Sequence, residues 1–128
     1  MIEGYFRQVE SIIASTSIVH SSSITYDKRS TYVGFIRGSI YFLEGSVLYL
    51  REFVNAQTGA ERYMYAYHYQ RSDGTFVFRY DNTPHFSALP TFPHHTHERS
   101  ESTVVSASPP DLQGVLAEIQ GLLAAPAP

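Results

Sequence analysis

Histidine and arginine side chains that could act on a phosphodiester are concentrated in the second half of the chain. His68 and Arg79 lie in two alternating segments, and four of the six histidines follow between residues 85 and 97. Imidazoles serve as general acid and base near neutral pH, and arginine stabilises charge developing on a phosphate. These residue types favour metal-independent RNA cleavage. The catalytic candidates are His68, Arg79, Asp81, His85, His94, His95 and His97.

Substrate binding is expected beside these groups. Arg51 is the candidate for holding phosphate, with Tyr49 and Asn82 as further substrate-binding residues. A metal site is the weaker interpretation of the histidines, because they lack the i, i+4 spacing of a zinc-binding helix and the chain has no cysteine. We therefore expect no metal and no other cofactor. A purely structural role also stays open, in which the Pro- and His-rich segment covers a sheet edge.

The ends of the chain carry the pattern of amphipathic helices. Apolar residues recur at helical spacing from Ile2 to Ile13 and again from Leu112 to Leu123. Ser108 is a plausible N-cap for the second helix, followed by Pro109 at its first position. We expect residues 1–123 to form one domain and residues 124–128 to be a disordered tail.

Between the helices the period changes to two, which is typical of strands. Strands are predicted near residues 17–27, 31–43, 46–55, 61–71 and 75–82. The fold class is therefore α+β, an antiparallel meander of about five strands with both helices packed on one face. The stretch from Asn82 to Ser108 is long for a connection, so we expect it to be a functional flap or poorly ordered.

Two turn signals and a third, less certain turn predict how the strands pair. Asp73-Gly74 as a two-residue turn sets His68 opposite Arg79. The weaker signal Glu44-Gly45 sets Arg37 opposite Glu52, as a structural salt bridge. A turn near Thr58-Gly59 brings Tyr49 beside His68, although a slip of one residue there would exchange the two faces.

These pairings predict one aromatic face and one mixed face. The aromatic face holds Tyr63, Tyr65, Tyr67 and Tyr69 with Phe76, Phe78 and Tyr80, joined by Phe35, Tyr41 and Leu43. Alternating tyrosines usually form a core, so we expect the helices here, with a base-stacking platform as the alternative. The mixed face collects Tyr49, Arg51, His68, Arg79 and Asp81, with Gly34 and Gly38 nearby, and is the candidate site.

Composition excludes several other classes of protein. The absence of cysteine rules out a disulfide framework, and no segment approaches the roughly 20 apolar residues of a membrane span. The N-terminus has no basic region typical of a signal peptide, so a cytoplasmic location is expected. A net charge of -3 argues against a globally basic nucleic-acid binder, but it leaves room for a local arginine patch.

The chain from about Tyr41 onward resembles the TumE family of bacterial toxin–antitoxin proteins. The resemblance is carried by Leu50-Arg51-Glu52-Phe53-Val54, Tyr65-Ala66-Tyr67-His68-Tyr69-Gln70, Phe78-Arg79-Tyr80-Asp81-Asn82 with Pro84-His85, and Thr91-Phe92-Pro93-His94-His95-Thr96-His97. It implies a small cytoplasmic toxin, encoded beside a helix-turn-helix antitoxin that neutralises it and represses the operon. It implies no catalytic residues, so the site rests on the chemistry above.

The leading hypothesis is a growth-inhibiting toxin that acts on RNA as a metal-independent ribonuclease. Arg51 and Arg79 would hold phosphate, and His68 with one later histidine would move protons. The first alternative is a non-enzymatic binding module that occupies a cellular target, which the acidic net charge favours. A His-ligated metal enzyme is another alternative, and a third is a homodimer joined by a sheet edge or helix face without catalysis.

Overall fold

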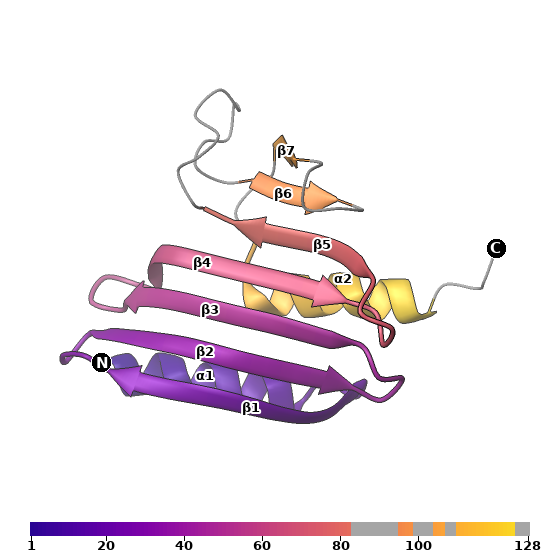
Figure 1. The fold of residues 1–128 in the computed structure, drawn as a ribbon. Helices are drawn as coiled ribbons and strands as arrows, with labels where there is room; N and C mark the ends of the chain where they lie inside the picture. The colour runs from indigo at the N-terminus through magenta and orange to yellow at the C-terminus, as the bar shows by residue number, and fades with distance from the viewer. Residues whose placement is uncertain (83–94, 99–103, 107–109, 125–128) are drawn as a thin grey trace.

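The fold is an antiparallel sheet with two helices, shown in Figure 1 as a computed structural model. The structure describes residues 1–82, 95–98, 104–106 and 110–124. The elements are α1 (Ile2–Ala14), β1 (Val19–Lys28), β2 (Val33–Phe42), β3 (Val47–Asn55), β4 (Glu61–Gln70), β5 (Phe76–Asp81), β6 (His95–Glu98), β7 (Val104–Ser106) and α2 (Leu112–Ala124). Each strand pairs antiparallel with the next, so the sheet follows chain order. The predicted α+β meander is confirmed.

Two short strands extend the sheet beyond the five that were predicted. β6 and β7 lie within the stretch for which we expected a flap or poor order. They were not predicted because runs of four and three residues are too short to show an alternating pattern. Of the predicted tail, Ala124 belongs to α2 and residues 125–128 lie outside the described residues.

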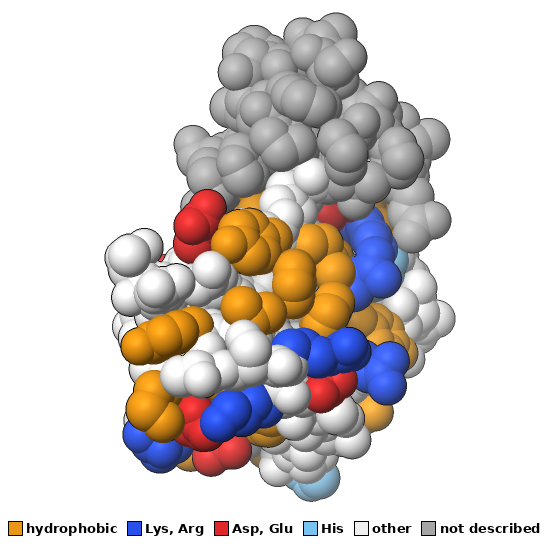
Figure 2. Space-filling model, turned by 90° about the vertical axis from the view of Figure 1, so that its left-hand side faces the viewer, with side chains coloured by type: hydrophobic (Ala, Val, Ile, Leu, Met, Phe, Trp, Pro, Cys, Tyr) orange, Lys and Arg blue, Asp and Glu red, His pale blue; other side chains and the backbone are white. Residues whose placement is uncertain are grey.

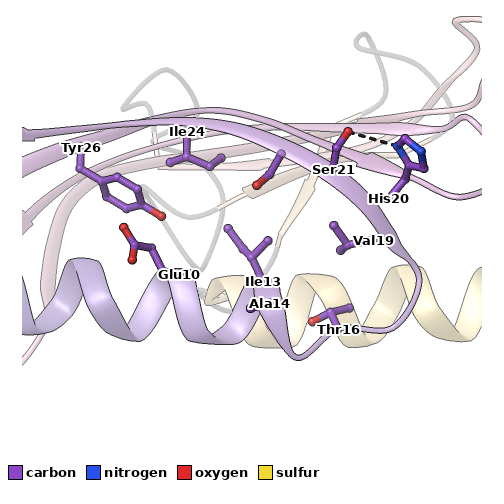
Figure 3. Close-up of a pocket in the computed structure, with 10 residues that line it drawn as sticks. Glu10, Ile13, Ala14, Thr16, Val19, His20, Ser21, Ile24 and Tyr26 are labelled. Atoms are coloured by element: carbon purple, nitrogen blue, oxygen red, sulfur yellow. Dashed lines mark hydrogen bonds between the residues drawn. The ribbon is translucent and has the colours of Figure 1, made fainter.

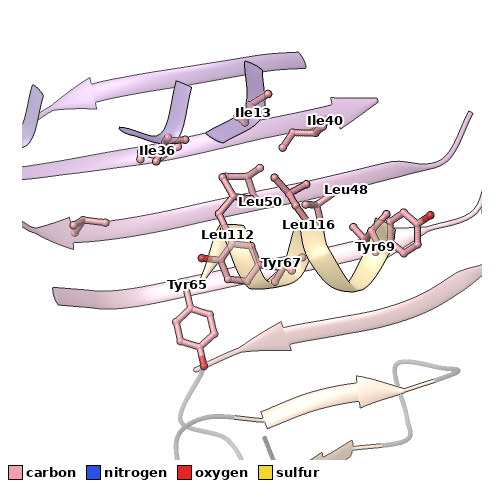
Figure 4. Close-up of a cluster of buried hydrophobic side chains, with 14 of the residues drawn as sticks. Ile13, Ile36, Ile40, Leu48, Leu50, Tyr65, Tyr67, Tyr69, Leu112 and Leu116 are labelled. Atoms are coloured by element: carbon pink, nitrogen blue, oxygen red, sulfur yellow. The ribbon is translucent and has the colours of Figure 1, made fainter. Parts of the chain in front are cut away.

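Both helices cover the same face of the sheet, which we call the covered face; the other is the open face. In Figure 1 both helices lie behind the sheet, α1 behind the first strands and α2 behind later ones. Their apolar stripes are buried, and Figure 4 shows them meeting strand residues in one core. Burial of each large apolar side chain contributes about 1.5–3 kcal/mol. No helix among the described residues is long and apolar enough to cross a membrane.

A glycine in β2 lets α1 approach the sheet closely. A Cβ at Gly34 would lie 2.6 Å from Phe6 Cζ and 2.9 Å from Ile2 Cγ1. Gly34 pairs with Val54, and Gly38 pairs with Leu50, both of which are buried in the core. The expectation that these glycines lie beside the open site is therefore wrong, because both lie on the covered face.

The hairpin between β2 and β3 differs from the prediction by one residue. Phe42 N donates to Ser46 O at 3.0 Å, so residues 43–45 form a three-residue loop, with Gly45 at a φ of 100°. Such loops place glycine in the left-handed region, whereas the prediction assumed a two-residue turn. Arg37 consequently pairs with Arg51, and the predicted pairing of Arg37 with Glu52 is wrong.

This one-residue shift exchanges the faces of β2. Phe35 and Tyr41 share the open face with Arg37, and Leu43 lies in the exposed loop. Their predicted place on the aromatic face is therefore wrong. Glu52 pairs with Ile36 and is buried on the covered face.

The hairpin between β4 and β5 has the same loop length, but its predicted pairs are correct. Arg71 N donates to Thr75 O at 2.8 Å, which leaves a three-residue loop ending at Gly74. A bulge between Tyr69 and Gln70 compensates for the extra loop residue. His68 therefore pairs with Arg79 as predicted, with Tyr67 opposite Tyr80 and Tyr69 opposite Phe78. The bulge moves Phe76 beside His68, away from its predicted face.

A second bulge separates the tyrosines of β4. Tyr49 pairs with His68 as predicted, but the register of β3 and β4 shifts between Phe53 and Val54. Tyr65, Tyr67 and Tyr69 are at most 2% exposed, which confirms the core interpretation for these three. Tyr63 is 49% exposed and contacts the Phe53 ring, so its predicted place in the core is wrong.

Candidate functional site

A cross-strand row on the open face brings predicted catalytic residues together. His68 pairs with Tyr49 on one side and with Arg79 on the other, and the register of β6 sets His97 opposite Arg79. Because neighbouring strands lie about 4.8 Å apart, the backbone positions of His68 and His97 are roughly 10 Å apart. Arg79 therefore lies between two histidine positions, so a phosphate at its guanidinium would have a histidine position on either side.

Two aromatic rings flank the His68 imidazole. The Tyr49 ring lies at a centroid distance of 6.1 Å, and the Phe76 ring at 5.3 Å in an edge-to-face arrangement. Such contacts favour a defined ring orientation. His68 is half-buried, whereas Tyr49 is 43% exposed, so the tyrosine ring is the more accessible of the two.

A buried carboxylate orients the central arginine of the row. Arg79 Nε donates to Asp81 Oδ2 at 2.9 Å, and Asp81 is 3% exposed. The pair restrains the planar guanidinium, whose five donors have a fixed geometry. Because Asp81 is buried behind this contact, its chemistry fits the positioning of Arg79 rather than direct contact with substrate.

Asn82, predicted to bind substrate, uses its amide to hold β4. Its Oδ1 accepts a hydrogen bond from Tyr65 N at 2.9 Å, and its Nδ2 donates to Tyr63 O at 3.1 Å. These bonds lie next to the β4 bulge, where the sheet pairing is interrupted. The described contacts are thus those of a structural clamp.

Arg51, predicted to hold phosphate, lies one row away from His68. It pairs directly with Arg37, and both side chains are exposed. Neither forms an ion pair with any side chain in the described part of the chain. The hairpin shift thus created a pair of arginines that the sequence analysis placed on different faces.

The remaining predicted histidines are only partly placed. His95 lies in β6 opposite Asp81, while His85 and His94 lie outside the described residues. Within the described ranges, no three His, Asp or Glu side chains form a group that could hold a metal ion. The structure thus brings His68, Arg79 and Asp81 together with the backbone positions of His95 and His97.

The structure contains a buried polar cluster on the covered face that was not predicted from the sequence. Glu52 is 1% exposed and accepts hydrogen bonds from the Tyr5 hydroxyl and, at 2.5 Å, from the Tyr67 hydroxyl. Arg62 Nη1 donates to the Tyr67 oxygen at 2.9 Å, and its guanidinium lies 4.7 Å from the Tyr65 ring centroid. The cluster therefore links α1 to the centre of the sheet.

The pKa values of Tyr67, Tyr5 and Arg62 in this cluster are all raised. Burial, and then the negative Glu52, raise the pKa of Tyr67 well above its usual range, and they raise that of Tyr5 as well. For Arg62, burial opposes the charged form, but Tyr67 and Glu52 outweigh it and raise the pKa. Both Glu52 oxygens have donors, so this arrangement is that of a structural network. A glutamate at a core position of an alternating strand is the signal that could have revealed it.

A hollow between α1 and β1 offers different chemistry. Figure 3 shows its lining side chains from both elements, and its volume is about 500 Å³. Glu10 points into it near Tyr26, and burial followed by Glu10 raises the pKa of Tyr26 to about 12. Among its described lining residues there is no lysine or arginine and there is an acidic Glu10, so the hollow is poorly suited to phosphate. The open face is therefore the better candidate.

Comparisons with known proteins identify the family. No curated protein and no solved structure matches the chain. The family model described as Toxin TumE matches residues 9–123, which is most of the chain. The match includes the strands that carry the open-face row, and it implies an antitoxin partner. The chain belongs to the TumE toxin family, whose members are toxins of toxin–antitoxin systems.

Proposed function

We propose that this toxin cleaves RNA without a metal ion, using the row of His68, Arg79 and His97 on the open face. The observation that carries the proposal is the register, which sets Arg79 between two histidine positions on adjacent strands. Arg79 is oriented by Asp81, and its side chain is 26% exposed. These features support a reaction centred on a phosphate held at Arg79.

The chemistry requires two proton transfers and no other reactant. One imidazole removes the proton of a ribose 2′-hydroxyl, whose oxygen attacks the adjacent phosphorus. The P–O5′ bond breaks, and the second imidazole protonates the departing 5′-oxygen. Arg79 stabilises the negative charge on the pentacovalent phosphate. The products are a 2′,3′-cyclic phosphate and a 5′-hydroxyl.

We assign a role to each group on the basis of its placement. His68 is one proton-transfer group, and His97 is the partner we favour among His85, His94, His95 and His97, since its position faces Arg79. Arg51 holds another phosphate of the same RNA, with Tyr49 beside it. Asp81 is a positioning residue. Asn82 supports the site by shaping the adjacent strand and does not contact substrate directly in this proposal.

The proposal includes the biological setting. A helix-turn-helix antitoxin neutralises the toxin in the cytoplasm, where RNA is available as substrate. Residues 1–123 form the toxin domain. Whether the chain acts as a monomer or a homodimer does not alter the chemistry, because every residue named above comes from one copy.

Incubation of the purified toxin with total RNA tests the reaction. We expect cleavage with and without EDTA, and fragments ending in 2′,3′-cyclic phosphate and 5′-hydroxyl groups. Cleavage that disappears with EDTA supports instead a His-ligated metal enzyme. No cleavage under either condition, while growth inhibition persists, supports a non-enzymatic binding module.

A double variant tests the site itself. His68→Ala with Arg79→Ala removes one proton-transfer group and the phosphate contact, so we expect growth inhibition and RNA cleavage to be lost. Antitoxin binding and the urea unfolding midpoint serve as controls for the fold. Unchanged toxicity in this variant, with the fold intact, would show that the site lies elsewhere.

A further inference from the structure

A pocket on the open face lies next to the proposed catalytic row of His68, Arg79 and His97, and its side chains differ in chemistry from those of the row. It spans β1 to β4, has a volume of about 550 Å³, and is lined by Thr25, Asp27, Phe35, Arg37, Arg51 and Met64 among others. This volume falls in the usual range for small-molecule and nucleotide sites. Seen from one end of the sheet, Figure 2 shows hydrophobic side chains adjoining Lys and Arg side chains.

The charges in this pocket favour an anion. Arg37 and Arg51 occupy directly paired positions, where like charges repel each other. Among the described residues, no carboxylate forms an ion pair with either. The nearby Asp27 is paired with Arg29 at 3.0 Å. A phosphate between the two guanidinium groups would relieve the repulsion and accept hydrogen bonds from both.

An aromatic surface adjoins the arginines. The Phe35 and Phe53 rings stack with a centroid distance of 4.6 Å, and the Tyr63 ring lies 5.4 Å from that of Phe53. Arg29 lies over Phe35 at 5.0 Å. The rings are half-buried or exposed, so their accessible surfaces can stack with a base. Bases are accessible for such stacking only when they are unpaired.

The pocket and the catalytic row form a continuous surface. The arginines belong to the cross-strand row that runs through Arg51, Ala66 and Asp81. The adjacent row on the same face contains Tyr49, His68 and Arg79. Residues two apart along a strand are separated by roughly 6.6 Å and neighbouring strands by about 4.8 Å. The backbone positions of Arg51 and Arg79, one row and two strands apart, are therefore roughly 12 Å from each other.

From this arrangement we propose that the pocket is a binding subsite for single-stranded RNA. Arg37 and Arg51 hold a phosphate, and Phe35, Phe53 and Tyr63 stack with an unpaired base. Another phosphate farther along the same RNA then reaches Arg79. This inference rests on the proposed function for its biological meaning, but RNA binding at the pocket can be measured without cleavage.

Fluorescence anisotropy with a labelled 12-nucleotide 2′-O-methyl RNA measures binding, because this probe cannot be cleaved through its 2′-oxygen. We expect the wild type to bind the single strand at least tenfold more tightly than a blunt 12-base-pair duplex. Arg37→Ala with Arg51→Ala should weaken single-strand binding by about 10- to 100-fold. The slope of log affinity against log salt concentration should fall by about 0.7 for each phosphate that the variant no longer neutralises.

Matched variants separate charge from position. Arg7→Ala with Arg71→Ala removes the same charge from exposed sites outside the pocket, and we expect at most a threefold effect. Phe53→Ala should weaken single-strand binding by about tenfold while leaving the salt slope unchanged, because stacking releases no counterions. Circular dichroism and the urea midpoint check that each variant folds.

The outcomes distinguish this inference from the proposed ribonuclease. If the pocket variants keep wild-type affinity for the single strand while His68→Ala with Arg79→Ala abolishes cleavage, the subsite is wrong and the proposed function stands. If the variants lose RNA affinity but no RNA is ever cleaved, the subsite stands and the ribonuclease is wrong. The subsite is also wrong if the wild type binds the duplex as tightly as the single strand. It is equally wrong if the pocket variants lose affinity only for the purified antitoxin and keep their affinity for RNA.

Discussion

The two faces of the sheet differ in whether their charged side chains have partners, as Arg51 and Glu52, two adjacent residues of β3, show. Glu52 lies on the covered face, and both of its carboxylate oxygens accept hydrogen bonds from tyrosine hydroxyls. Arg51 lies on the open face beside Arg37, with no ion pair to a described side chain. A buried charge must be partnered for the chain to fold, whereas an exposed charge can be left for a ligand. The contrast fits a structural role for the covered face and the binding role that we propose for the open face.

Aromatic residues show the same division. Tyr67 and Tyr69 are buried, and their hydroxyls are bonded to Glu52 and Ser46. On the open face, Tyr49 and Tyr63 are each more than two-fifths exposed. The tyrosines therefore supply both buried core rings and exposed rings on the open face. The bulge at the start of β4 places Tyr63 among the exposed rings.

The strongest test of this contrast exchanges two adjacent residues for alanine, one at a time. Glu52→Ala leaves two buried hydroxyls without their acceptor, so we expect a loss of about 3 kcal/mol in the free energy of unfolding. Arg51→Ala should change that free energy by no more than about 0.5 kcal/mol. Urea unfolding of both variants measures the difference. Equal destabilisation by the two substitutions would contradict the division of roles.

A smaller effect is expected for single hydroxyl groups. Tyr67→Phe removes the donor to Glu52 and the acceptor for Arg62, which should lower the free energy of unfolding by about 2 kcal/mol. Tyr49→Phe on the open face is the matched control, with an expected change within about 0.5 kcal/mol. A stability loss in the control as large as that of Tyr67→Phe would place a structural hydroxyl on the open face.

Raising the pH into the alkaline range should lower the free energy of unfolding gradually. Burial raises the pKa of Tyr65 to about 12, above the value of about 10 for an unfolded chain. The folded state therefore favours the neutral phenol, and the resulting stability is complete below pH 10 and is lost as pH rises toward 12. Urea unfolding between pH 9 and pH 12 measures the loss. Tyr65→Phe should show a shallower decline, and an identical decline would remove Tyr65 as a cause.

The sequence predicted the fold well because its signals were local and repeated. Period-two segments and amphipathic helices identified five strands and both helices. The pairing of His68 with Arg79 was also predicted correctly, although for an incomplete reason: a bulge cancelled an unexpected loop residue. Local patterns therefore located the elements and, through compensation, the centre of the candidate row.

Features that depend on exact loop length or on distant contacts could not be predicted. The β2–β3 loop has three residues instead of two, which paired Arg37 with Arg51 and moved Phe35 to the open face. The bonds from Tyr5 and Tyr67 to Glu52 join residues far apart in the chain. Tyr67 lies on the strand paired with that of Glu52, but only the packing of α1 brings Tyr5 to this carboxylate, and nothing in the sequence near Glu52 reveals that partner.

The length of the loop between β2 and β3 limits which insertions and deletions preserve the open face of this toxin. Side chains alternate between faces, so the parity of a hairpin's length determines which residues meet on either side. Removing one residue from the loop would separate Arg37 from Arg51 without altering either side chain. Related chains can lengthen such a loop by two residues and keep the surface, whereas a change of one residue needs a bulge to restore it. Gaps in this hairpin are therefore as informative as substitutions when the binding surfaces of relatives are compared.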